Sequence, residues 1–175
     1  MGYVLLPYDE VGRMSMSSDA HARPFWEVKS LEALSDQEWD ALCDGCGRCC
    51  LNKLEDEETG EIFWTNVACK LLDHDTCQCS DYEHRWNHVP DCVKLDVEEV
   101  VNHTYTWLPP SCAYRLISEG KPLYWWHHLV SGDRDLVHAV GASVQNRVIS
   151  EEDIPADTLE EHLEDWPGID PFAGC

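Results

Sequence analysis

Four cysteines lie within eight consecutive residues in the first third of this chain. Cys43, Cys46 and Cys49 are spaced C-x2-C-x2-C, and Cys50 follows directly. Two-residue spacers let successive sulfurs converge on one metal centre, and the interleaved glycines let backbone N–H groups turn toward the sulfurs. Buried free thiols or disulfides are the alternative interpretation, but this glycine-rich pattern is not typical of a core segment. The run therefore predicts a centre that holds zinc or an iron–sulfur cluster.

Further thiols are available to such a centre. The remaining candidate ligands are Cys69, Cys77, Cys79, Cys92 and Cys112. Together with the first run they exceed the four ligands of one zinc ion or one cubane cluster, so we expect two centres or one polynuclear centre. Neighbouring side chains usually diverge, so the adjacent pair Cys49–Cys50 favours a polynuclear centre over isolated mononuclear zinc. Cys175, at the end of the chain, is expected to be a free surface thiol.

Basic residues lie close to these cysteines in a chain that is otherwise acidic. Those between Cys43 and Arg115 are Arg48, Lys53, Lys70, Arg85, Lys94 and Arg115. Cations near thiolates lower their pKa and offset the negative charge of a sulfur-ligated centre. The alternative is that these residues pair with neighbouring carboxylates.

The sequence also leaves an enzyme open as an alternative. A metal-dependent enzyme needs an open coordination position beside the centre and an acid–base group, for which His127, His128 and Asp81 are the first candidates. A packed or surface role is the simpler expectation for each histidine. No dinucleotide fingerprint, P-loop, serine-hydrolase elbow or zincin motif is present. The leading hypothesis is a metal-binding module with a redox, sensing or metal-handling role, and a disulfide-stapled interaction protein is a third.

The charge balance narrows the class of partner. The formal net charge is −22 at pH 7. Nucleic acid and anionic membrane surfaces would repel such a protein, because both are bound through Lys and Arg. The acidity favours a basic protein partner, or simply keeps the protein in solution. We expect no membrane association. The sequence does not indicate an oligomeric state.

The compartment follows from the cysteines and the N-terminus. Disulfides need an oxidising compartment, which secreted proteins reach through a signal peptide. Residues 1–7 carry no basic segment, and their short apolar run is interrupted by Pro7. We therefore predict a cytoplasmic protein whose cysteines are reduced or bound to metal.

The elements that must position the cysteines are short. We expect a flexible N-terminal tail over residues 1–24, a cysteine-cluster metal-binding domain over 25–166 and a C-terminal tail over 167–175. Ser35 and Glu38 form a capping box that predicts a short helix ending at the cysteine run. An acidic turn over 55–60 precedes a strand over 61–67.

The second half of the domain is less regular. Residues 69–92 are predicted to be a long loop that metal bonds would order. Helices are expected over 96–103, 110–119 and 156–165, and 136–144 could be a strand or a short helix. The fold class predicted is α+β or mainly α, in a small, loop-rich single domain organised around a cysteine-ligated metal centre.

The cysteine run and several later segments resemble a known family. The run at 43–50 resembles the signature of the CxxCxxCC cysteine-cluster proteins, described as zinc- or iron-chelating. The segments that resemble its YcgN-like branch within the YkgJ family are TNVAC (65–69), CQCSDY (77–82), VPDC (89–92), LPPSCAYR (108–115) and WHHL (126–129). The resemblance implies a cytoplasmic bacterial protein that binds zinc or iron through these cysteines, and it implies no reaction. The same signature occurs in flagellin lysine methylases, which favours iron–sulfur.

Overall fold

The computed structural model describes residues 23–166 of the 175-residue chain. The predicted tails fall almost entirely on residues 1–22 and 167–175, which lie outside the described residues. Cys175 belongs to the second of these ranges. The domain boundaries at residues 25 and 166 therefore stay predictions.

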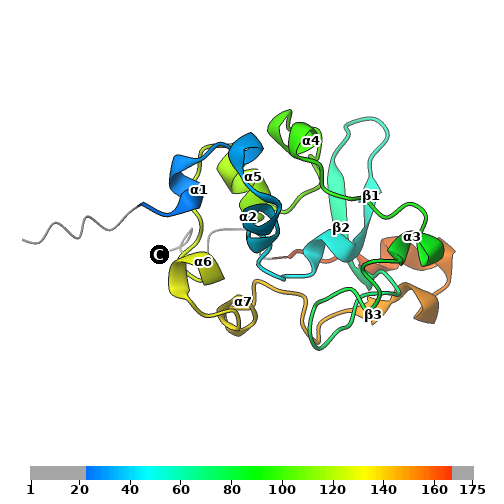
Figure 1. Cartoon of the computed structure of the whole chain (residues 1–175). Helices are drawn as coiled ribbons and strands as arrows, with labels where there is room; N and C mark the ends of the chain where they lie inside the picture. The colour runs from blue at the N-terminus through cyan, green and yellow to red at the C-terminus, as the bar shows by residue number, and fades with distance from the viewer. Residues whose placement is uncertain (1–22, 167–175) are drawn as a thin grey trace, which may run out of the picture.

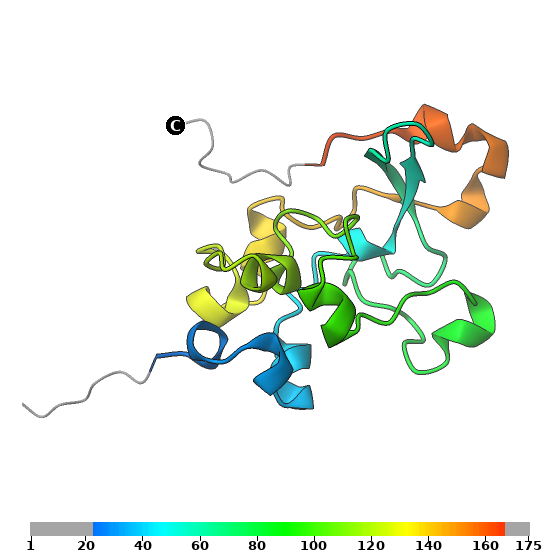
Figure 2. The same ribbon diagram turned by 90° about the horizontal axis from the view of Figure 1, so that it is seen from above.

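The helices are short and gather beside the strands. In both ribbon views α1, α2, α5, α6 and α7 lie on one side of the described structure and the strands lie on the other (Figures 1 and 2). Helices this short are not stable alone, so packing must hold them. The α-helices are α1 (Phe25–Val28), α2 (Asp36–Ala41), α3 (Arg85–His88), α4 (Val97–Val101), α5 (Ala113–Ser118), α6 (His128–Ser131) and α7 (Leu136–Ala139). The 3₁₀ helices are Leu31–Ala33, Arg48–Cys50, Glu151–Asp153 and Ala156–His162.

A small mixed sheet provides the β part of the fold. Its strand order is β1 (Leu51–Glu55), β2 (Ile62–Ala68) and β3 (Ile149–Ser150). β1 and β2 form an antiparallel hairpin, whereas β2 and β3 are parallel. The fold is thus a small, loop-rich α+β domain, as predicted.

Three buried apolar clusters meet at the cysteine run. Leu42, directly before it, packs with residues of α4 and α5 in the first cluster. Leu51, directly after it, packs with β2 and Val144 in the second. Cys46, within it, packs with Trp126 and Val137 in the third. The run therefore connects the apolar clusters, and its backbone path is fixed by packing at both ends.

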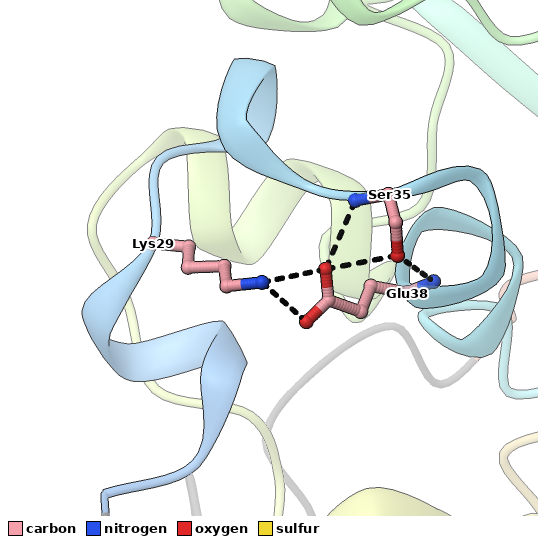
Figure 3. A network of polar contacts seen from close by, with 3 residues as sticks. All are labelled: Lys29, Ser35 and Glu38. Atoms are coloured by element: carbon pink, nitrogen blue, oxygen red, sulfur yellow. Dashed lines mark hydrogen bonds and ion pairs between the residues drawn. The ribbon is translucent and has the colours of Figure 1, made fainter.

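The helix before the run begins as predicted. The Ser35 hydroxyl accepts a hydrogen bond from the Glu38 N–H at 3.3 Å, and the Glu38 carboxylate accepts from the Ser35 N–H at 2.9 Å (Figure 3). Lys29 also donates to Glu38 at 2.6 Å. This complete capping box fixes the start of α2, and the helix ends at Ala41, with Leu42 as its C-cap directly before Cys43.

The other expected elements differ in their bounds. The predicted strand is β2, and the helix predicted over 96–103 is α4, capped by Asp96. The helix predicted from residue 110 begins only at Ala113, because Pro109 and Pro110 lie in a turn closed by the Cys112 N–H on the Pro109 carbonyl at 2.9 Å.

Two further predicted segments form short helices of different kinds. Residues 136–144 contain the short helix α7 and no strand. The last helix is a 3₁₀ helix, in which both the N–H and the hydroxyl of Thr158 donate to the Pro155 carbonyl three residues earlier. Residues 69–92 are mostly loop, as predicted, with α3 and one isolated bridge between Leu72 and Cys79. Within residues 23–166 we find no helix long and apolar enough to cross a bilayer.

Candidate metal centre

The backbone of the cysteine run turns twice through left-handed conformations. Gly45 and Gly47 have φ values of 75° and 74°. A Cβ on Gly47 would lie 2.7 Å from Val144 Cγ2 and 3.2 Å from Cys77 Cβ, so only glycine fits there. The Val144 N–H also donates to the Cys46 carbonyl at 2.9 Å. The run is therefore held against the segment around Val144, and its cysteines project from a constrained loop.

The adjacent sulfurs of the run converge. The Sγ atoms of Cys49 and Cys50 lie 3.9 Å apart. Two sulfurs bound at about 2.3 Å to one tetrahedral zinc ion are roughly 3.8 Å apart. The expectation that neighbouring side chains diverge therefore does not hold for this pair, whose spacing also suits two ligands of one metal.

Cys112 joins the thiols of the run. Burial raises the pKa of Cys46, and the charges of Asp44, Cys49 and Cys43 raise it further. Burial likewise raises the pKa of Cys112, with further contributions from the charges of Asp44 and Cys49. The effect of Cys49 and Asp44 on Cys112 places it near the run, although it is 62 residues beyond Cys50 in sequence (112 − 50).

The later cysteines form a separate group. Burial raises the pKa of Cys69, and the charges of Glu151, Cys92 and Cys79 add to this effect. The Cys69 N–H donates to the Cys50 carbonyl at 2.8 Å, so the two groups are joined through the backbone. Cys69, Cys79 and Cys92 thus share a neighbourhood of their own.

Cys77 differs from the other candidates. It is buried in the second apolar cluster with Leu51 and Val144. Burial raises its pKa, while hydrogen bonds from Ser143 and Val144 lower it. Apolar packing and hydrogen bonds therefore explain the position of the Cys77 thiol without a metal.

One lysine, Lys53, contacts the backbone of the cysteine run. Lys53 Nζ donates to the carbonyls of Leu51 at 2.6 Å and Cys49 at 3.2 Å, and it lies 4.8 Å and 5.0 Å from the ring centroids of Trp64 and Trp107. Burial lowers its pKa to about 8, whereas the charges of Cys49 and Cys50 raise it. Among residues 23–166 it forms no ion pair with a carboxylate. Its position is consistent with the predicted supporting role.

Other basic residues have different partners. Arg115 pairs with Glu119 at 2.8 Å, which is the alternative that the sequence left open. Arg85 is buried between the rings of Tyr82 and Trp86, with centroids 3.9 Å and 3.7 Å away. The six basic residues near the cysteines therefore differ in how well they could offset the charge of a thiolate centre.

The two candidate histidines stack on each other, and one of them is hydrogen-bonded within the core. His127 is buried; its Nδ1 accepts from the Leu129 N–H at 3.2 Å, so its Nε2 carries the hydrogen donated to the Leu42 carbonyl at 3.1 Å. His128 stacks on His127 with ring centroids 4.6 Å apart. Asp81, the third candidate, lies within ion-pair distance of His84 and His88 on an open surface.

A cavity opens beside the first cysteine. It measures about 200 Å³ and is lined by Asp40, Cys43, Asp44, Gly45, Gln78, Arg134, Asp135 and His138. A larger cavity of about 340 Å³, between α4 and α5, is lined by no cysteine and lies away from this chemistry. The polar residues of the smaller cavity were not predicted from the sequence. Only Asp44 could have been identified from the sequence, because it lies within the cysteine run.

The donor set fits a metal, but it is not already arranged around one. In the described part of the chain no three His, Cys, Asp or Glu side chains are placed to hold a metal ion. Two observations favour a cationic centre nonetheless. The Cys49 and Cys50 sulfurs have the spacing of two ligands of one metal. The Asp44 Oδ2 atom is buried and accepts no hydrogen bond. Rotations of the side chains would be needed to bring the donors together.

Comparisons with known proteins agree with metal chelation in general. Residues 42–113 match the CxxCxxCC family, described as a "putative zinc- or iron-chelating domain". A UPF0260 protein of Rhizobium etli is 56% identical over 144 residues, covering 82% of this chain and 90% of the relative. UPF0260 proteins of Rhodopseudomonas palustris (55% over 148 residues; 84% and 86% covered) and Agrobacterium fabrum (54% over 144 residues; 82% and 88% covered) are similar as well. No solved structure matches the chain.

Proposed function

This chain belongs to the UPF0260 family and contains a CxxCxxCC domain, and from this we propose that it binds zinc or an iron–sulfur cluster at the start of that domain. The thiolates that we assign to this main centre are Cys43, Cys46, Cys49, Cys50 and Cys112. The set offers more sulfurs than one tetrahedral centre needs, so one of them could serve as a bridge or remain unbound.

The observation that carries the proposal is the convergence of thiols on a constrained loop. The Cys49 and Cys50 sulfurs are 3.9 Å apart, and Cys112 shares their electrostatic neighbourhood. Packed thiols of this number are unfavourable as thiolates without a cation, because their charges repel. A bound metal would supply that cation and would replace the thiol protons.

We propose a second, weaker centre at Cys69, Cys79 and Cys92. Burial raises the pKa of Cys69, and the charges of Cys92 and Cys79 raise it further; all three thiols lie in the loop that the sequence predicted to need metal bonds. Cys77 has the least support as a ligand, because it packs in an apolar cluster and is hydrogen-bonded there.

The role that suits such a centre is redox, sensing or metal handling in the cytoplasm. Clusters bound by several thiolates carry electrons or respond to oxidants, whereas closed zinc–thiolate sites order a fold or hold zinc for transfer. The choice depends on which metal is bound. Elemental analysis and an absorption spectrum of protein purified without oxygen distinguish the two. Iron with acid-labile sulfide would assign a cluster, and colourless protein with stoichiometric zinc would assign a zinc site.

Serine variants test which thiols matter. Cys46→Ser and Cys49→Ser should lose metal and much of the folding stability, because binding energy at such sites is folding energy. Cys175→Ser is the matched control and should keep the wild-type metal content. Variants Cys46→Ser and Cys49→Ser that stay folded with full metal content would overturn the assignment.

The cavity beside Cys43 favours a second candidate, a metal-dependent enzyme. His138 and Arg134 line this cavity, so an acid–base group and a cation would flank a substrate there. Small anions such as azide should then change the absorption spectrum of the cobalt-substituted protein. A spectrum that azide leaves unchanged would indicate a closed centre and would contradict the enzyme.

A further inference from the structure

The cysteine run contains a carboxylate whose surroundings differ from those of other acidic side chains. Asp44 lies between Cys43 and the first left-handed glycine, and it is only 9% exposed. Its Oδ1 atom accepts a hydrogen bond from the Cys46 N–H at 3.0 Å. Its Oδ2 atom is buried and has no hydrogen-bond partner. Among the described residues, Asp44 is the only buried Asp or Glu of this acidic protein.

An unpaired buried carboxylate oxygen is unfavourable without a cation or a donor. Taking a charged oxygen out of water costs free energy unless hydrogen bonds or an opposite charge compensate for it. No described Lys, Arg or His forms an ion pair with Asp44. Burial lowers the pKa of Arg48, and the charge of Asp44 offsets part of this effect, so one buried cation already lies near the carboxylate. Oδ2 itself accepts no hydrogen bond, and a bound metal cation would complement it directly.

The thiols around Asp44 indicate what this complement is. Burial raises the pKa of Cys43, Cys46 and Cys112, and the charge of Asp44 raises it further, so Asp44 lies close to these three thiols. Asp44 also lines the cavity of about 200 Å³ together with Cys43. The carboxylate therefore lies near thiols that we assign to the main centre, and its buried Oδ2 atom is an unused donor there.

We propose that Asp44 Oδ2 is an oxygen ligand of the metal bound by the cysteine run, so that the centre is a mixed thiolate–carboxylate site. This inference rests on the proposed function. Carboxylates are accepted ligands of zinc and iron, but they are harder donors than thiolates. The metal position that Asp44 occupies is then the one most easily exchanged, and it faces the cavity.

The chain offers a sharp variant for this proposal. Asn at position 44 can still accept from the Cys46 N–H through its own oxygen, so the local turn is kept. Its second terminal atom is then an amide nitrogen, which has no lone pair available for a metal. Asp40→Asn is the matched control, because Asp40 lines the same cavity but is exposed.

X-ray absorption at the metal edge of the purified holoprotein is the direct measurement. Wild type and Asp40→Asn should show one oxygen scatterer, at about 2.0–2.2 Å for zinc, beside sulfur scatterers at about 2.3 Å. Asp44→Asn should lose the oxygen scatterer and bind metal at least about tenfold more weakly in a chelator competition.

The outcomes separate this inference from the proposed function. A wild-type first shell made only of sulfur would overturn the ligand role of Asp44 and leave the metal-binding proposal intact. An oxygen scatterer that persists in Asp44→Asn would also overturn it, since another group would then supply the oxygen. Should Asp44→Asn fail to fold, the wild-type spectrum alone still decides. A wild-type protein that binds neither iron nor zinc would overturn both proposals.

Discussion

The ammonium group of Lys53 donates a hydrogen bond to the carbonyl oxygen of Cys49 at 3.2 Å. The same group lies over the rings of Trp64 and Trp107. A cation is thus fixed beneath the cysteine run by two carbonyls and two aromatic faces, with no carboxylate to neutralise it among the described residues. A fixed positive charge of this kind would stabilise the negative charge of a thiolate centre nearby.

Replacing Lys53 by Met should weaken metal binding by about tenfold, the lower end of the range seen when groups supporting a metal site are removed. The reason is the loss of a positive charge, because Met keeps an apolar contact with both tryptophans. Chelator competition measures the affinity. Lys121→Met, at an exposed lysine that pairs with Glu119, is the control and should bind as wild type does. Equal affinities for both variants and wild type would show that Lys53 has no supporting role.

Gly47 should be the least replaceable residue of the run. In Gly47→Ala the new Cβ meets Val144 Cγ2 at 2.7 Å and also has to adopt a positive φ. We expect a loss of about 2–5 kcal/mol in the free energy of unfolding, from backbone strain and overpacking together. Urea denaturation of the metal-loaded protein measures this loss.

Gly132→Ala isolates the packing part of that loss. Gly132 has a φ of 79°, close to that of Gly47, but a Cβ there meets nothing within 4 Å. It should therefore carry only the backbone cost, about 1–2 kcal/mol. If both variants lost the same stability, the close approach of Gly47 to Val144 would not matter.

Local signals accounted for part of the fold and long-range contacts for the rest. Ser35 and Glu38 are three residues apart, so the capping box and the start of α2 could be predicted from sequence. β1 could not, because Asn52 and Lys53 carry no strand pattern and the strand exists only by pairing with β2. The sequence also placed all nine described cysteines in one candidate set. Their division into groups depends on folding, which brings Cys112 back to the run, and the burial of Asp44 depends on it as well.

His127 should act on stability and not as a metal ligand. Its Nε2–H donates to the carbonyl of Leu42, the residue before Cys43. His127→Ala removes a buried hydrogen bond and leaves a cavity, so the free energy of unfolding should fall by about 2–4 kcal/mol. Metal per folded molecule should stay unchanged. His84→Ala, at an exposed ring, is the control and should change neither quantity by much. A folded His127→Ala that has lost its metal would instead identify His127 as a ligand.

The capping box should make stability depend on pH in the acid range. The hydrogen bond with Lys29, followed by that with the Ser35 N–H, lowers the pKa of Glu38 from 4.5 to about 2. Because the pKa is lower in the folded state, the ionised carboxylate stabilises the fold fully above pH 4.5. This contribution is lost as the pH falls from 4.5 toward about 2.

Glu38→Gln tests this pH dependence. The amide can still complete the capping box but does not ionise. The urea midpoint should fall less steeply between pH 4.5 and about 2 in Glu38→Gln than in wild type. Parallel curves for the two proteins would contradict the lowered pKa of Glu38.

The most direct test of the metal centre is the metal content of protein purified without oxygen, compared between wild type and Cys49→Ser. We predict stoichiometric iron with acid-labile sulfide, or stoichiometric zinc, in wild type, and a loss of most of that metal in Cys49→Ser. Wild-type protein that is folded and contains neither metal, or a Cys49→Ser variant that keeps it all, would contradict a centre built on the cysteine run.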